Sequence, residues 1–209
     1  GVVPGVKYLW ININAQCEDT CPHKEMPPHS LAVDDWLNVV DEAASLGVTC
    51  VMICVGNSFS EHPEVWEISR WAQSTHGLNV GFHTYCRLLS DEDVAELGRL
   101  DPERTCLFVD KAALPLMQQY EERGVRLCVA DVTEEDHCPS CEEPNSMVFV
   151  GPEGVLYSCG MVLGNDTFRL GHVGEKPLHD VLEDEAVDRR VPAGTPRSDW
   201  STLQRLGPY

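Results

Sequence analysis

The run Tyr8-Leu-Trp-Ile-Asn-Ile-Asn14 leads directly into Ala-Gln-Cys17-Glu-Asp-Thr-Cys21-Pro-His-Lys24. The first part is short and largely apolar, and this pattern is typical of a strand that is buried on both faces. The second part places two thiols in the loop that follows the strand. The sequence therefore predicts a buried strand whose carboxyl end carries Cys17 and Cys21.

Four further runs share the short, apolar character of the first, and they predict strands at 49–55, 79–85, 105–110 and 125–131. The segments between the runs have a 3.6-residue apolar period, which predicts helices at 33–46, 63–74, 91–97 and 112–122. Gly47 and Gly124 follow two of these helices, where glycine is common. Ser90 with Asp93 resembles a capping box at the start of the third helix.

This alternation of strands and helices with short links implies right-handed parallel crossovers. We therefore expect the α/β class, with an open parallel sheet or a partial (β/α) barrel. Functional groups of such folds lie beyond the carboxyl ends of the strands. The polar and thiol groups at these predicted ends are Asn14 with the cysteine loop, 54–58, His83 with Cys86, Asp110 and Asp131.

The pattern changes after residue 131. Cys138-Pro-Ser-Cys141 precedes two short apolar runs, 148–150 and 155–157, which a Gly-Pro-Glu-Gly turn joins. These runs predict a β-hairpin that brings Cys159 back toward Cys138 and Cys141. A short helix is expected at 178–182, and from residue 186 the chain lacks periodicity and reads as a tail.

The spacing Cys138-x2-Cys141-x17-Cys159 predicts a metal site. A Cys-x2-Cys knuckle can direct two sulfurs at one ion and a hairpin can return a third, so one more ligand would complete a zinc site or a cubane. His172, His179 and Cys128 are candidates for that ligand. Zinc, an iron–sulfur cluster and purely structural thiols all remain open from the spacing.

The charge and the cysteine content of the chain restrict the cellular compartment and the macromolecules that it can bind. The 209 residues include 15 Lys and Arg against 34 Asp and Glu, a formal net charge of -19, which opposes binding to nucleic acid or to an anionic membrane. A basic peptide or protein is a more compatible partner, although an acidic surface can simply be solvated. No secretory segment and no apolar run of about 20 residues is present, so we expect a cytoplasmic protein. Ten cysteines in a reducing compartment favour metal ligands over disulfides.

Together these motifs resemble the radical SAM superfamily with a SPASM or twitch-type extension. The resemblance spans residues 8 to 183 and includes the strand, the cysteine loop and the alternating helices and strands. Its most family-like stretch is Gly151-Pro-Glu-Gly-Val-Leu-Tyr-Ser-Cys159, followed by Leu170-Gly-His-Val-Gly174. Cys141-x12-Gly154-x4-Cys159 is similar to the start of the motif of the extension.

In that family three cysteines hold a 4Fe–4S cluster whose open iron chelates S-adenosylmethionine (SAM), and one electron cleaves SAM to a 5′-deoxyadenosyl radical that abstracts hydrogen. Cys17 and Cys21 match two of the three cysteines, but Lys24 stands at the third position. A lysine cation cannot replace a thiolate. The Gly-Gly-Glu of the family would fall near Val55-Gly56-Asn57, which has no acidic residue.

Other residues at the predicted edge could complete the two sites that the resemblance implies. Cys54 or Cys86 could supply the third sulfur, His23 could supply an imidazole, and Asn57 with Ser58 could bind SAM through neutral hydrogen bonds. The alternative interpretation makes four cysteines small apolar side chains of buried strands, namely Cys50, Cys54, Cys106 and Cys128.

Polar residues at the strand ends also have two interpretations. Asp110 and Asp131 could bind ribose hydroxyls or cap the following turns. His83 could donate a proton or be a hydrogen-bonded buried histidine.

These observations predict a partial barrel over 6–132, a cysteine-rich hairpin extension over 133–183 and an irregular tail over 184–209. The leading hypothesis is a radical SAM/SPASM-like enzyme that has one or two 4Fe–4S clusters, uses an electron donor and abstracts hydrogen from a peptide or protein. Its expected metal ligands are Cys17, Cys21, Cys86, Cys138, Cys141 and Cys159, and its expected SAM contacts are Asn57, Ser58 and Asp110. The alternatives are a degenerate iron–sulfur partner without SAM cleavage and a structural zinc protein.

Overall fold

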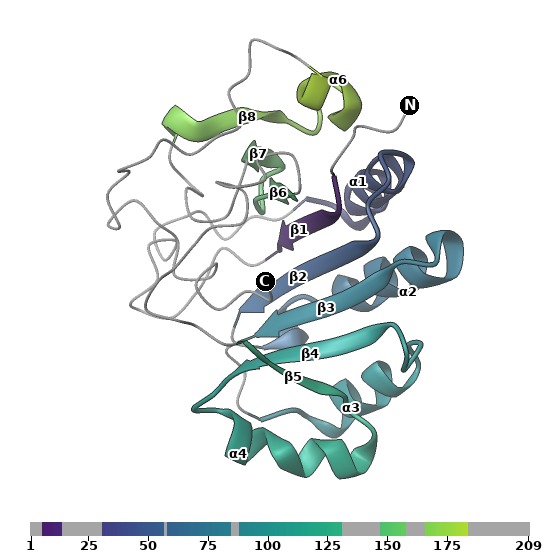
Figure 1. The fold of residues 1–209 in the computed structure, drawn as a ribbon, viewed down its shortest axis with the longest axis vertical. Coiled ribbons are helices and arrows are strands. Elements are labelled where there is room, and N and C mark those ends of the chain that lie inside the picture. The colour runs from purple at the N-terminus through teal and green to yellow at the C-terminus, as the bar shows by residue number, and fades with distance from the viewer. Residues whose placement is uncertain are drawn as a thin grey trace.

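A computed structural model of the chain describes residues 6–13, 31–56, 58–84, 88–130, 147–157 and 166–183. Within these ranges the strands form one sheet in the order β5-β4-β3-β2-β1-β6-β7-β8 (Figure 1). The first six are parallel to their neighbours, whereas β7 and β8 are antiparallel. The predicted α/β class is therefore confirmed.

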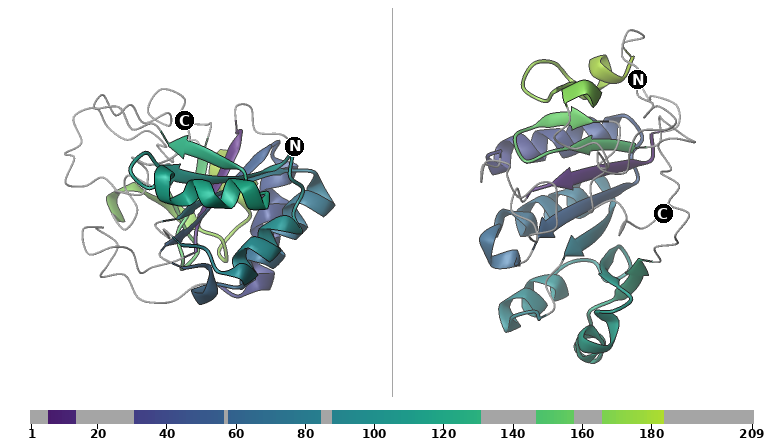
Figure 2. Two further views of the ribbon diagram at one scale, coloured as in Figure 1. Left: turned by 90° about the horizontal axis from the view of Figure 1, so that it is seen from below. Right: turned by 90° about the vertical axis from the view of Figure 1, so that its left-hand side faces the viewer.

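The five predicted strands of the barrel are all present. They are β1 (Tyr8–Asn12), β2 (Cys50–Gly56), β3 (Asn79–Thr84), β4 (Thr105–Asp110) and β5 (Leu127–Ala130). Alternate residues of these strands enter a large apolar core with the helices α1 (Val33–Ser45), α2 (Glu64–His76) and α3 (Asp91–Gly98). The helices cover one face of the sheet, which we call the outer face, and Figure 2 shows the arrangement from two further sides.

The ends of the helices follow the local sequence. Ser90 accepts a hydrogen bond from the Asp93 amide, and the Asp93 carboxylate accepts one from the Ser90 amide, so the predicted capping box of α3 is confirmed. Gly77, with φ of +63°, ends α2 in the left-handed conformation that glycine adopts readily. A short 3₁₀ helix, η1 (Phe59–Glu61), lies between β2 and α2.

The single α-helix predicted at 112–122 is wrong. The chain forms a short α4 (Leu114–Met117) that continues as a 3₁₀ helix, η2 (Gln118–Arg123). Pro115 limits the helix start because proline fits only the first turn. Gly124, with φ of +89°, ends η2 as expected.

The predicted hairpin is confirmed. It consists of β6 (Met147–Val150) and β7 (Val155–Tyr157), and the turn closes with the Gly151 amide 2.9 Å from the Val155 carbonyl oxygen. A third strand, β8 (Arg169–His172), pairs with β7 and follows a 3₁₀ helix, η4 (Asp166–Phe168). The short helix expected at 178–182 is α6 (Leu178–Glu183).

The hairpin joins the main sheet. β6 lies parallel to β1, with Tyr8 opposite Met147 and Ile11 opposite Val150. The domain limits at 132 and 183 stay a prediction, and the tail over 184–209 lies outside the described residues. In the described ranges no helix has the length and apolar content needed to cross a bilayer.

The inner face of the sheet, opposite the helices, has a second apolar core. Its fully buried members come from β1, β2, β6 and β7 and are Trp10, Met52, Cys54, Met147, Phe149 and Tyr157. Gly81 of β3 allows Met52 and Phe108 to approach closely, because a Cβ there would overlap Met52 and lie 2.8 Å from Phe108 Cε2. The inner face is thus packed, apart from the region over β3 to β5 described below.

Candidate functional site

Three polar side chains lie side by side where β1, β2 and β3 approach their carboxyl ends. Asn12 is opposite Cys54, and Cys54 is opposite His83. Strand alternation places all three on the inner face, because their neighbours Ile11, Ile53 and Phe82 belong to the core beneath the helices. We call Asn12, Cys54 and His83 the edge row.

The side chains of the edge row are buried. The exposed fractions of its members are 1%, 1% and 2%. Trp10 supports the row, since its indole Nε1 donates a hydrogen bond to Cys54 Sγ at 2.6 Å. The indole also lies 6.4 Å from the His83 ring and stacks on Phe149 at 6.1 Å, measured between ring centroids. His83 is therefore a buried histidine of the inner face.

Asn12 brings a primary amide into the row. Neither its Oδ1 nor its Nδ2 has a hydrogen-bond partner among the residues that the structure describes. Buried polar groups nearly always have a partner, so the unpaired amide makes Asn12 a candidate contact for a group that the structure does not contain. Sequence inspection missed Asn12, because one polar residue in an apolar run can equally face solvent.

The end of β2 is the place where the family resemblance puts the contact to the SAM amine. Gly56 has φ of +74°, and its carbonyl oxygen accepts a hydrogen bond from Thr84 Oγ1 at 2.7 Å. Ser58 Oγ accepts a hydrogen bond from the Ser60 amide at 3.2 Å and lies 2.7 Å from Ser60 Oγ. The Ser58 hydroxyl thus caps η1, whereas Asn57 lies outside the described residues.

All six predicted metal ligands lie outside the residues that the structure describes. Outside the described ranges lie Cys17, Cys21, Cys86, Cys138, Cys141 and Cys159, together with His23, Lys24 and Asp131. Within those ranges no group of three or more His, Cys, Asp or Glu side chains is arranged to hold a metal ion. Asp110 ends β4 opposite Ala130 of β5, as predicted from the sequence.

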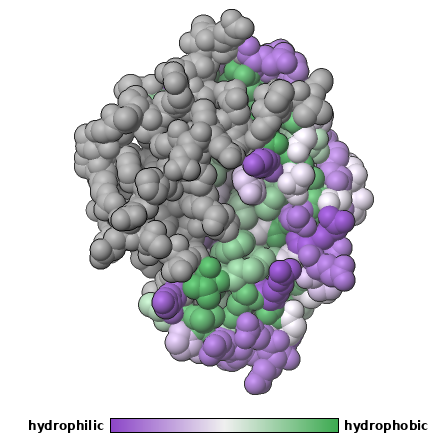
Figure 3. Space-filling model, in the orientation of Figure 1, coloured by the Kyte–Doolittle hydropathy of each residue, from purple (hydrophilic) through white to green (hydrophobic). Residues whose placement is uncertain are grey.

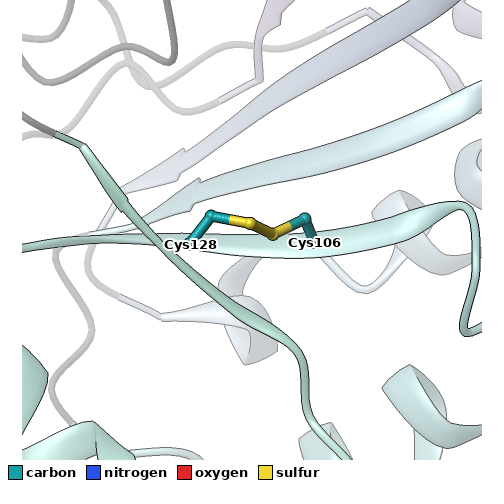
Figure 4. The surroundings of a disulfide bond; sticks show 2 residues. All are labelled: Cys106 and Cys128. Carbon is teal, nitrogen blue, oxygen red and sulfur yellow. A yellow bond between two sulfur atoms is a disulfide. The ribbon is translucent and has the colours of Figure 1, made fainter.

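Two cysteines that were expected to be separate apolar side chains form a disulfide, so this expectation is wrong. Cys106 of β4 and Cys128 of β5 are joined across the sheet, with their Cα atoms 6.3 Å apart (Figure 4). The register that pairs Leu107 with Leu127 places the two thiols diagonally on one face. The 22-residue separation does not reveal this pairing, because it depends on the register.

The other two cysteines of the strands keep free thiols. Cys54 is buried, as the apolar interpretation predicts, and Cys50 is partly buried. Burial raises the pKa of the Cys50 thiol to about 11. Cys50 is therefore protonated at neutral pH and is a poor metal ligand and nucleophile.

The three candidates for the fourth ligand of the carboxyl-terminal site are all engaged elsewhere. Cys128 is in the disulfide. His172 Nδ1 accepts a hydrogen bond from the Gly174 amide at 2.9 Å, so Nε2 carries the proton and donates to the Glu153 carbonyl oxygen at 2.7 Å. His179 Nε2 lies 3.1 Å from Glu183 Oε1. The disulfide removes Cys128 as a candidate, whereas His172 and His179 stay candidates for the fourth ligand.

A pocket of about 400 Å³ opens on the inner face near the amino ends of the strands. Met52, Phe108 and the disulfide form part of its wall, and Arg104 and Arg126 also line it. Figure 3 shows hydrophobic surface over this part of the sheet, bordered by hydrophilic residues. The pocket lies at the opposite end of the strands from the edge row.

No protein-family model matches the sequence, and no curated protein matches it. Solved structures do match. The crystal structure of BtrN in complex with AdoMet and 2-DOIA has a TM-score of 0.62 at 12% identity, covering 86% of this chain and 83% of BtrN. Streptococcus suis SuiB bound to S-adenosylmethionine has a TM-score of 0.65 at 11% identity, covering 98% of this chain and 70% of SuiB.

A third similar structure is native anSMEcpe with bound AdoMet, which has a TM-score of 0.58 at 10% identity and covers 85% of this chain and 81% of anSMEcpe. At these identities the likeness concerns the fold. The sheet of parallel strands with helices on its outer face matches these structures over most of the chain. The chain thus has the partial-barrel fold of the radical SAM/SPASM-type enzymes, as its motifs predict.

Proposed function

We propose that the chain is a radical SAM/SPASM-like iron–sulfur enzyme that binds SAM at the carboxyl edge of its parallel strands and acts on a peptide or protein. The observation that carries this proposal is the fold likeness to structures determined with AdoMet, combined with two cysteines directly after β1. The peptide substrate is supported by SuiB bound to its precursor peptide SuiA, with a TM-score of 0.61 at 11% identity. The net charge of -19 favours a basic peptide.

The donor set near β1 fits a cluster if a third thiolate joins Cys17 and Cys21. Cys86 is a suitable candidate, because it lies two residues after β3 and the ends of β1 and β3 flank that of β2. Neighbouring strands are about 4.8 Å apart, so loops at these ends can meet. When bound, a reduced 4Fe–4S cluster supplies the electron that splits SAM into methionine and, after hydrogen abstraction from the substrate, 5′-deoxyadenosine.

The carboxyl-terminal cysteines are proposed to hold a second cluster. The antiparallel register pairs Phe149 with Tyr157, so continuation of the same register would bring Cys159 level with the start of β6. Cys141 precedes β6 by six residues, which leaves a short path from the Cys138 knuckle to Cys159. This supports a shared site for the three thiols.

A second candidate is a degenerate relative that holds a cluster but does not cleave SAM. Lys24 at the third cysteine position and the absence of an acidic residue at 55–57 favour it. The Ser58 hydroxyl, which already caps η1, favours it as well. This candidate would transfer electrons or bind a partner. A zinc protein would lack both the absorption of an iron–sulfur cluster and the reaction with SAM.

The test is anaerobic reconstitution with iron and sulfide, followed by reduction with SAM. We expect about eight irons per chain for two cubanes, absorption near 400 nm and formation of 5′-deoxyadenosine. The double variant Cys17→Ala/Cys21→Ala should lose about four irons and all of the 5′-deoxyadenosine. Cys138→Ala/Cys141→Ala should lose the other irons. Cys50→Ala is the control and should keep both clusters.

The outcomes separate the candidates. About four irons without 5′-deoxyadenosine would support the degenerate relative. Zinc without iron would support the structural site and exclude the radical proposal. Full iron content in both double variants would show that the assigned cysteines are not ligands.

A further inference from the structure

The buried amide of Asn12 has no hydrogen-bond partner among the described residues. Asn12 is the last residue of β1, is 1% exposed and lies on the inner face, next to Cys54 in the register. A primary amide has two N–H donors and an oxygen with two lone pairs. Leaving both ends without a partner in a buried position destabilises the folded chain. A purely structural residue at this position would more simply be apolar, as Ile11 and Ile13 are.

None of the neighbouring groups that the structure describes forms a hydrogen bond with the amide. The indole N–H of Trp10, which lies two residues before Asn12 on the same strand face, is directed to Cys54 Sγ at 2.6 Å. Among the described residues of the edge row, neither the Asn12 amide nor the Cys54 thiol carries a formal charge that would pair with a charged ligand group. These surroundings suit a neutral ligand group with a donor beside an acceptor.

We propose that Asn12 binds a neutral, planar edge of the ligand through paired hydrogen bonds, as a primary amide does with a second amide or with adenine. The inference rests on the proposed function and deepens it. Both the adenine of SAM and an amide of a peptide substrate present this chemistry. Asn12 lies five residues before Cys17 in the sequence.

The first experiment measures the melting temperature of the ligand-free protein. Asn12→Leu removes the amide and keeps the branched shape, and we expect the Tm to rise by about 2–4 °C. Asn12→Ala adds no bulk but leaves a small cavity, which opposes the gain from removing the amide, so its Tm should stay within about 2 °C of the wild type. Thr84→Val is the matched control, because the Thr84 hydroxyl is buried at the same edge and donates to Gly56 at 2.7 Å. The Tm of this control should fall.

The second experiment identifies the ligand group by calorimetric titration of the anaerobically reconstituted protein. If adenine is bound, Asn12→Ala should bind SAM at least about tenfold more weakly than the wild type. If a substrate amide is bound, SAM affinity stays unchanged. The wild type saturated with SAM should then bind N-acetylglycine N-methylamide, a capped peptide unit, and Asn12→Ala should not.

The proposal is overturned if Asn12→Leu and Asn12→Ala both melt lower than the wild type by as much as Thr84→Val does, because the amide would then stabilise the fold as the paired Thr84 hydroxyl does. Equal affinities of wild type and Asn12→Ala for both probes also overturn it. These results are distinct from failure of the proposed function, which would appear as wild-type protein that neither binds nor cleaves SAM. In that case the melting temperatures and the amide titration still test Asn12.

Discussion

At the scale of single residues, the inner face holds both paired and unpaired polar side chains. Trp10 and Cys54 satisfy each other through the 2.6 Å hydrogen bond, and Phe149 stacks on the indole. Asn12 at the end of the same face has no such partner among the described residues. The packed groups lie at the ends of β1 and β2, and the buried amide lies beside them on the same strand face. Rigid elements position binding groups more accurately than loops do.

Cys50 should be unreactive at neutral pH. Its pKa of about 11, raised from 9.0 by burial, leaves about a hundredfold less thiolate at pH 8 than a solvated thiol has. Alkylation with iodoacetamide, followed by mass spectrometry of the peptide, should therefore accelerate about tenfold per pH unit up to about pH 11. A plateau near pH 9 would contradict the raised pKa. Cys50→Ser removes the labelled site and serves as the control.

The raised pKa of Cys50 makes the stability of the fold depend on pH. Because the folded state raises the pKa of Cys50 above the value in the unfolded chain, unfolding releases a proton between about pH 9 and 11. The free energy of unfolding that this pKa difference contributes is fully present below pH 9 and is lost as the pH rises through about 11. We therefore expect the Tm of the wild type to fall relative to the Tm of Cys50→Ser as the pH rises over this range. Below the range the difference between the two Tm values should be constant.

At the scale of the elements, the disulfide links neighbouring strands. Cys106 of β4 and Cys128 of β5 enclose the segment that includes α4 and η2. Closing a loop of 22 residues restricts the unfolded chain, so Cys106→Ser/Cys128→Ser should lower the free energy of unfolding by about 3 kcal/mol. Urea unfolding measures this loss, and Cys50→Ser is the control. A non-reduced digest without the linked peptide would exclude the bond.

The start of α3 gives a second prediction at this scale. The Ser90 side chain accepts the Asp93 amide at 3.0 Å, and its removal leaves this amide without its cap. Ser90→Ala should lower the free energy of unfolding by about 1 kcal/mol in urea unfolding. Ser74→Ala is the control, since the Ser74 hydroxyl is exposed and only contacts the Arg70 carbonyl oxygen within its own helix. Equal losses in the two variants would show that the cap has no special role.

Elements with a strong local signal could be predicted from the sequence, whereas features that depend on strand register could not. The apolar run at 105–110 and the Gly-Pro-Glu-Gly turn specify a strand and a hairpin by themselves, and both are confirmed. The Cys106–Cys128 bond needs two strands aligned to within one residue. The edge row needs three aligned strands, so Asn12 could be recognised only in the folded chain.

At the scale of the whole molecule, the hairpin is a continuation of the sheet. β6 pairs with β1 along four residues, and Phe149 of β6 is fully buried against Trp10. The partial barrel and the hairpin therefore share an apolar core on the inner face. A shared core couples the unfolding of the two parts, even though their cysteines are proposed to serve two separate sites.

Phe149→Ala tests this coupling. Removing a fully buried phenylalanine should lower the free energy of unfolding by about 3–5 kcal/mol. If the core is shared, amide hydrogen exchange should accelerate in β2 and β3 as well as in β6 and β7, and thermal unfolding should remain a single transition. Leu116→Ala, at a side chain that is 45% exposed, is the control and should leave exchange in all four strands unchanged. Faster exchange confined to β6 to β8 would instead identify the extension as a separate domain, because an independent unit unfolds without exposing the strands of the barrel.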